Sequence, residues 1–413
     1  MLPTALTTLL VYLLSLLTDS HDHDTASPPP SPPLSFELRH LHAVSPSAHV
    51  VFSDVPQRAE ILSDNPHLLH TRRIRSFKPP SFVLHARARA QSMRFGQSLL
   101  QDFPWEEEEV PAPDIEDRAT LLELAKMSNN AYVEPDDVAW YGLGSDWNVS
   151  YPFGWEPDAD GFRGHVFATP DNKTVVLALK GTSSGFLGGG GPTVKKDKLN
   201  DNLLFSCCCA RVDWTWTTVC GCYRSGWKCN ADCLEDSLVD DSLFYPIGTN
   251  LYNNLTYMYP ESTIWVIGHS LGGALASLLG ATFGSPVVAF EAPGEKMAAG
   301  RLHLPSPPST LHITHVYHTA DPIAMGTCNG VLSSCALGGY AMETRCHLGK
   351  SIVYDTVSSL GWSVDVRTHG IVNVIEKILN TTWPPAVEVG REVPLAQEEA
   401  DCVECYSWEF GDF

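Results

Sequence analysis

The chain has few basic residues for its length. Of its 413 residues, 27 are Lys or Arg and 48 are Asp or Glu, so the formal net charge at pH 7 is -21. Nucleic-acid binding depends on Lys and Arg that neutralise phosphates, so this composition excludes nucleic acid as a partner. The same charge opposes docking on anionic lipid at neutral pH. Protonation of carboxylates and His relaxes that repulsion, so an acidic compartment suits the protein.

Internal repeats and a second long apolar run are also absent from the sequence, which excludes a multi-span membrane protein. The one apolar run lies in residues 2–18, which carry no charge and precede the acidic Asp19. Such a run at the N-terminus is an export signal, and its length is at the lower limit for crossing a bilayer. This length is compatible with a cleaved signal peptide and with a retained signal anchor. Because the small-residue cleavage pattern is poor, we favour a signal anchor in residues 1–18.

Cysteine, in contrast, is abundant. The twelve residues form three groups: seven between Cys207 and Cys233, three between Cys328 and Cys346, and the pair Cys402 and Cys405. This number fits an oxidising lumen and a set of disulfides. Because seven is odd, at least one bridge must join the first group to a later one if all twelve pair.

A zinc site is the alternative interpretation of the first group, because Cys220-x-Cys222 and Cys229-x3-Cys233 could offer thiolates. Asn-x-Ser/Thr sequons favour the secretory route and therefore disulfides. We expect no metal and no cofactor. The four predicted glycosylation sites are Asn148, Asn172, Asn254 and Asn380.

Composition divides the chain into segments. Residues 27–34 are almost only Ser and Pro, which is typical of an extended linker. From residue 172 onward, strand-like runs alternate with helical stretches, which predicts a largely parallel sheet covered by helices. The expected segments are a signal anchor (1–18), a linker (19–35), an N-terminal lumenal region without an assigned function (36–110), an α/β domain (111–385) with a Cys-rich insertion (185–245), and a C-terminal tail (386–413).

The sequence Gly268-His269-Ser270-Leu271-Gly272 matches the G-x-S-x-G nucleophile elbow. Its two glycines permit a strained turn that exposes the serine hydroxyl. An apolar strand-like run, residues 264–267, enters the turn, and an Ala/Leu-rich helical stretch, residues 271–279, leaves it. This context predicts an α/β-hydrolase fold with Ser270 as the nucleophile.

A serine nucleophile needs a histidine that accepts its proton and a carboxylate that orients the histidine. The chain order in this fold is Ser, acid, His. Asp321 is the preferred acid because it follows the strand-like residues 311–319, and triad acids lie at strand ends. The alternative acids are Asp355 and Asp365.

Two histidines follow Asp321 in the sequence. His347 is next to a cysteine, in a loop that a disulfide would hold, whereas His369 lies in a polar turn before an apolar helical run. We therefore predict His369 as the general base.

The oxyanion formed during acyl transfer needs N–H donors. One should come from Leu271, after the nucleophile, and the other from a loop after an earlier strand. Thr182 follows the strand-like residues 174–180 and is the predicted second donor; an ordinary strand-ending turn is the alternative.

The stretch between this loop and the elbow contains glycines 188–191, three consecutive cysteines and several tryptophans. It could be a lid that opens at lipid. It could equally be a disulfide-stabilised surface insertion in which tryptophans are buried. The aromatic residues are Trp214, Trp216 and Trp227.

At these residues the chain resembles the class 3 lipases and, more narrowly, the fungal autophagy-related lipases. The similarity covers most of the chain from about residue 36 onward. It rests on a short N-terminal anchor and on residues 181–183, 197–210, 265–273, 290–294, 318–326, 339–350 and 367–370, and it includes the Cys402/Cys405 tail.

This resemblance implies the triad Ser270, Asp321 and His369. It also implies a single-pass type II membrane protein that travels through the endoplasmic reticulum, the Golgi and the multivesicular body. In the vacuole lumen, such a lipase would hydrolyse membrane phospholipids and also triacylglycerol. Its partners would be membrane lipids as substrate, with other vacuolar or autophagy proteins unidentified.

Two other functions are compatible with the sequence. A secreted carboxylesterase would use the same triad on soluble esters. A Cys-rich glycosylated ectodomain would keep the fold but only bind a partner. The intact Ser270, Asp321 and His369 argue against the second.

Overall fold

The computed structural model describes residues 34–44, 50–54, 68–134, 137–141, 162–183, 194–242, 244–399 and 401–413. Within these ranges no helix is long and apolar enough to cross a membrane. The predicted anchor, nearly all of the linker, Asn148 and glycines 188–191 lie outside them.

A nine-stranded sheet runs through the structure in the order β15-β14-β13-β12-β11-β8-β7-β2-β3. Its five middle strands are mutually parallel, as the sequence predicts. They are β8 (Thr174–Leu179), β11 (Thr263–His269), β12 (Val287–Phe290), β13 (Ile313–His318) and β14 (Lys350–Tyr354). Antiparallel strands complete both edges: β7 (Gly164–Ala168), β2 (Glu37–Val44) and β3 (Val50–Asp54) at one, and β15 (Gln397–Glu398) at the other.

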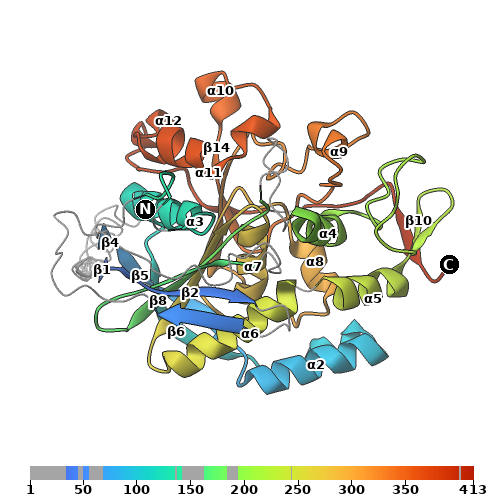
Figure 1. The fold of residues 1–413 in the computed structure, drawn as a ribbon, viewed down its shortest axis with the longest axis horizontal. Coiled ribbons are helices and arrows are strands. Elements are labelled where there is room, and N and C mark those ends of the chain that lie inside the picture. Colours follow the sequence, from blue (N-terminus) through green and yellow to red (C-terminus); the bar gives the residue numbers. More distant parts are fainter. Residues whose placement is uncertain are drawn as a thin grey trace, which may run out of the picture. The chain divides into compact units, whose positions relative to one another are not determined.

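Helices cover both faces of this sheet (Figure 1). Alternate side chains of a strand point to opposite faces, so Val266 joins one core cluster and Trp265 the other. The first face carries α4 (Val194–Phe205), α5 (Ala231–Asp241), α6 (Phe244–Met258), α7 (Leu271–Phe283) and α8 (Lys296–Arg301). The second carries α3 (Arg118–Asn130), α11 (Ile371–Asn373), η4 (Val374–Leu379) and α12 (Pro384–Val387).

Helix α3 begins directly after Asp117. Asp117 caps it, since its carboxylate accepts the N–H of Thr120 at 2.9 Å. Leu121 and Leu124 of its apolar face are fully buried against the sheet.

A separate two-stranded sheet in the N-terminal region pairs a basic run, residues 72–78, with an acidic run, residues 106–109. Strand β5 (Thr71–Lys78) pairs antiparallel with β6 (Glu106–Pro113), so the two runs of opposite charge lie side by side. Cross-strand ion pairs join Arg73 with Glu109 and Arg75 with Glu107. After β5 follow α2 (Phe82–Phe95) and η1 (Gln97–Leu100), and a short pair, β1 (Leu34–Ser35) and β4 (Leu68–Leu69), lies apart from the main sheet.

The boundaries expected at residues 110 and 385 fall inside one compact unit, Pro33–Phe413. Strands β2 and β3 come from the N-terminal region and β15 comes from the tail, yet all three pair within the main sheet. The fold therefore combines strands from all three segments in one main sheet.

All twelve cysteines form disulfides. A bridge leaves the first group, as predicted: Cys207 pairs with Cys405, 198 positions away. The others are Cys208–Cys229, Cys209–Cys220, Cys222–Cys233, Cys328–Cys335 and Cys346–Cys402. The tail also adds β16 (Glu409–Gly411) to β9 (Tyr223–Arg224) and β10 (Lys228–Asn230) in a three-stranded sheet.

Candidate active site

The G-x-S-x-G sequence forms a sharp turn between β11 and α7. Ser270 has φ 58° and ψ -131°, a strained backbone for a residue with a side chain, and its N–H donates to the carbonyl of Phe290 at 3.0 Å. A Cβ on Gly268 would lie 2.4 Å from the carbonyl oxygen of Gly272, and one on Gly272 would lie 2.4 Å from that of Leu179. Both glycines are therefore required by close backbone packing.

His369 joins the serine to a carboxylate. Its Nε2 lies 2.9 Å from Ser270 Oγ, and its Nδ1 lies 2.7 Å from Asp321 Oδ2. Asp321 is fully buried, whereas the side chain of His369 is 12% exposed. The three residues predicted from chain order thus lie in hydrogen-bond contact.

Burial alone would raise the pKa of Asp321, but His369 outweighs it by charge and hydrogen bonding and holds that pKa below its ordinary value. The N–H of Ile323 also donates to Asp321 Oδ1 at 2.9 Å. Asp321 is therefore an anion that can fix the His369 ring and stabilise an imidazolium.

The alternative triad residues have other partners. Asp355 caps α10 (Thr356–Leu360) through the N–H of Ser358, and Asp365 pairs with Arg367. His347 Nδ1 lies 2.6 Å from the carboxylate of Glu399.

The predicted oxyanion donors lie on the two segments next to Ser270. Leu271 is the first residue of α7, where N–H groups have no partner within the helix. A Cβ on Gly181 would lie 3.0 Å from Ser270 Cβ, so the loop that carries Thr182 packs directly on the elbow. Thr182 Oγ1 donates to Asp201 Oδ2 at 2.6 Å.

Helix α4 holds this loop through two buried carboxyl groups that sequence reasoning missed. Asp197 pairs with Lys180 at 3.2 Å and accepts the N–H of Ser183 at 2.8 Å. Burial, together with the Asp197 charge, raises the pKa of Asp201 to about 8. Asp197 and Asp201 are four positions apart, which places them on one face of a helix. This spacing was the sequence signal that could have identified them as a pair.

His269 was also missed, although it lies inside the elbow motif. Burial and the neighbouring His369 lower its pKa to about 3, so its ring is neutral. Its Nε2 lies 2.8 Å from the His369 carbonyl and must donate to it, so Nδ1 accepts the hydroxyl of Tyr132 at 2.8 Å. His269 thereby connects the backbone of His369 to the elbow and to Tyr132, in the turn that follows α3.

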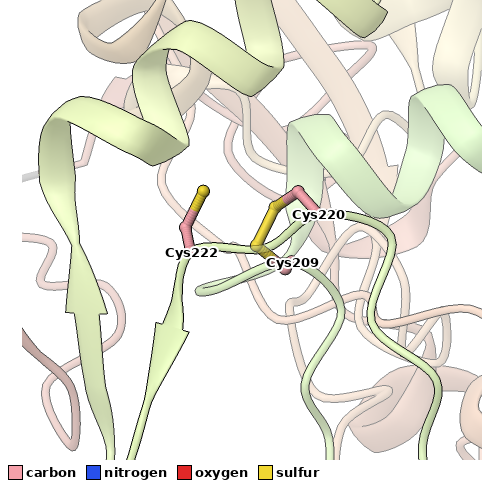
Figure 2. A group of neighbouring side chains, drawn as sticks. All are labelled: Cys209, Cys220 and Cys222. Atoms are coloured by element: carbon pink, nitrogen blue, oxygen red, sulfur yellow. A yellow bond between two sulfur atoms is a disulfide. The ribbon is translucent and has the colours of Figure 1, made fainter.

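The cysteine group that could resemble a metal site is fully oxidised. The sulfurs of Cys209, Cys220 and Cys222 lie within 4.8 Å of one another (Figure 2). Cys209 is bonded to Cys220, and Cys222 is bonded to Cys233. Thiolates are the zinc ligands, so the zinc interpretation is wrong.

The tryptophans of the Cys-rich insertion are not core residues. Trp214 is 85% exposed, Trp227 is 51% exposed and Trp216 is half-buried, so the structure does not have the buried tryptophans of the surface-insertion alternative. The predicted glycosylation sites at Asn172 and Asn380 are exposed, and Asn254 is half-buried.

A serine on a strand-to-helix elbow of a mainly parallel sheet, in contact with a histidine and a carboxylate, defines the α/β-hydrolase class. The family model for lipases of class 3 matches residues 242–286. A Cryptococcus neoformans protein (strain B-3501A) named "Putative lipase ATG15" is 52% identical over 366 residues, which cover 75% of this chain and 70% of that protein. The chain therefore belongs to the ATG15 lipase family, and it is a lipase.

A Mycosarcoma maydis protein of the same name is 52% identical over 314 residues, covering 73% of this chain and 60% of the relative. Among solved structures, the Lip2 lipase of Yarrowia lipolytica is similar with 16% sequence identity and a TM-score of 0.29, covering 58% of this chain and 80% of that chain. That score is too low to support an argument.

Proposed function

We propose that Ser270, His369 and Asp321 are the catalytic triad of a phospholipase that also cleaves triacylglycerol. The contacts of 2.9 Å and 2.7 Å that link the three side chains carry the proposal. Ser270 Oγ attacks the ester carbonyl as His369 takes its proton, and Asp321 stabilises the imidazolium. The N–H groups of Leu271 and Thr182 bind the oxyanion.

His369 gives its proton to the leaving alkoxide, which departs as an alcohol and leaves the acyl-enzyme. His369 then deprotonates a water that attacks the acyl carbonyl. The bond to Ser270 Oγ breaks, His369 returns the proton to that oxygen, and the carboxylic acid departs. The products are a fatty acid and a lysophospholipid or a partial glyceride.

We further infer a role in the vacuole, where the lipase would lyse autophagic bodies and multivesicular-body vesicles. The relatives' autophagy name and the acidic composition support it. In this proposal a type II single-pass anchor in residues 1–18 delivers the enzyme through the endoplasmic reticulum, Golgi and multivesicular body.

Release of fatty acid from phospholipid vesicles by the purified protein, at acidic and neutral pH, tests the chemistry. We expect Ser270→Ala to reduce the rate at least 10³-fold, in line with the loss of a triad nucleophile (about 10⁶-fold in known cases). Ser225→Ala, at an exposed turn serine, is the matched control and should keep the rate. Equal activity in Ser270→Ala would reject the nucleophile, and wild-type activity on soluble short esters alone would favour a carboxylesterase.

A further inference from the structure

A surface cavity of about 460 Å³ lies beside the segment that carries His369. Its walls come from both sides of that residue along the chain: from the turn between α10 and α11, which contains η3 (Val366–Thr368), and from the end of α11 and the first turn of η4. The wall residues that matter here are Trp362, Asp365, Arg367, Asn373 and Lys377.

The position of the cavity beside the His369 segment relates it to the leaving group of acyl transfer. The alkoxide that leaves the tetrahedral intermediate takes its proton from His369, so the alcohol part of the substrate departs on the histidine side of Ser270. In a glycerophospholipid, that alcohol carries the headgroup. Residues that flank His369 in the chain line the cavity, so it adjoins the segment that meets the departing alcohol.

The charges of the cavity fit an anion, although the whole chain carries -21. Arg367 binds Asp365 through Nε at 2.9 Å and also through Nη2, which neutralises that carboxylate. Within the described part of the chain, no group accepts from Arg367 Nη1, and the side chain is 76% exposed. Its remaining N–H groups can therefore donate to a phosphate oxygen.

Lys377 supplies the second cation. Its ammonium lies 5.7 Å from the centre of the Trp362 ring, and in the described ranges no carboxylate lies within 4.0 Å of it. Trp362 in turn packs edge-on against His318, with ring centres 5.3 Å apart. Asn373 donates to the carbonyls of Arg367 and Thr368 at 3.1 and 3.3 Å and so fixes the wall that bears the guanidinium.

We propose that this cavity is a headgroup subsite, in which Arg367 and Lys377 bind the phosphodiester of the glycerophospholipid whose ester is cleaved at Ser270. The inference rests on the proposed phospholipase function and deepens it. It names the residues by which the enzyme distinguishes a phospholipid from a neutral glyceride.

Lys377→Met tests the subsite, because Met keeps the apolar stem and removes the charge. Two soluble monomeric substrates should be compared: a short-chain phosphatidylcholine and the diacylglycerol that carries the same acyl chains. We expect the kcat/KM for phosphatidylcholine, divided by that for diacylglycerol, to fall about tenfold. This size is typical of the loss of one charge-assisted hydrogen bond. Lys173→Met, at a lysine 82% exposed in the turn before β8, should leave the ratio unchanged.

A parallel loss on both substrates would mean that Lys377 only supports the His369 segment, and an unchanged ratio would mean that the headgroup lies elsewhere. Either result overturns the subsite. Inorganic phosphate distinguishes a lipid headgroup from free phosphate. If phosphate inhibits diacylglycerol cleavage by the wild type, and Lys377→Met relieves this inhibition without changing the ratio, the cavity binds free phosphate instead. Wild-type activity on diacylglycerol alone would instead refute the phospholipase function itself.

Discussion

At the scale of single residues, the buried Glu291 is a second carboxyl group next to the triad acid Asp321, and the two share their ionisation. Glu291 is fully buried after β12, has φ 43°, and its Oε2 accepts the N–H of His318 at 3.4 Å. Burial, and then the charge and hydrogen bond of Asp321, raise the pKa of Glu291 well above its ordinary value. Two adjacent carboxyl groups cannot both ionise at low cost, so Glu291 keeps its proton and donates it to Asp321.

Glu291→Gln should therefore preserve activity at acidic pH and extend it to higher pH. Gln imitates the protonated carboxyl group but cannot ionise as pH rises. The pH profile of kcat/KM on a soluble short ester, from acidic to alkaline pH, measures the effect, with Glu388→Gln at an exposed position as the control. A loss of activity at acidic pH in Glu291→Gln would show that the ionised form is the working one.

At the scale of elements, the elbow depends on backbone atoms that approach more closely than side chains allow. The carbonyl of Gly272 occupies the space where a Cβ of Gly268 would lie, at 2.4 Å. Backbone cannot move aside as a flexible side chain can, so relief requires displacement of β11 or α7. Such a shift would move Ser270 away from His369.

Gly268→Ala should lower the free energy of unfolding by about 3 kcal/mol, at the upper end for overpacking, and remove most activity. Among the residues that the structure describes, no atom lies within 4 Å of a Cβ built on Gly300 in α8, so Gly300→Ala is the matched control. It should be neutral or stabilise by up to about 1 kcal/mol, because Ala is the better helix former. Chemical denaturation of both variants checks this, and similar stabilities would contradict the packing argument.

The sequence was sufficient for features that have a local or ordered pattern. The parallel strands followed from apolar runs, the elbow from five residues, and the contacting Asp321 and His369 from chain order. The side-chain contacts that surround the triad were not predictable, because each depends on which side chains meet across elements that are distant in sequence. They are the contacts of Asp201, Glu291 and His269. The pairing of β2, β3 and β15 with the main sheet was missed for the same reason.

At the scale of the whole molecule, buried titratable groups act on stability in opposite directions. Burial raises the pKa of Asp201 to about 8 and that of Glu343 to about 7, so the folded state binds protons that the unfolded state has released, and stability falls as pH rises toward 8. Buried histidines act below pH 6.5, where the unfolded state binds the protons and stability falls with falling pH. Their pKa values are lowered chiefly by burial, to about 4 in His85, His165 and His312 and to about 3 in His269.

Together, the buried carboxyl groups and the buried histidines predict maximum stability at about pH 6. Thermal unfolding between pH 4 and 9 should show Tm falling on both sides of this value. Asp201→Asn cannot ionise, so it removes the loss of stability that Asp201 causes between about pH 4 and 8. It should therefore reduce the fall up to pH 8 and move the maximum to higher pH. A Tm that rises steadily to pH 9 would contradict the assignment of protonated carboxyl groups.

The bridge between Cys207 and Cys405 has a consequence for biosynthesis. The 198 positions between them take roughly 10 to 40 s to synthesise at roughly 5 to 20 residues per second. Cys208 and Cys209 find their partners within 21 and 11 positions, so their bridges can close while Cys207 still waits as a thiol beside them. Until Cys405 is synthesised, Cys207 has no native partner and is open to premature pairing with a neighbouring cysteine. A chain that stops before Cys405 carries eleven cysteines, so at least one thiol is left unpaired within it.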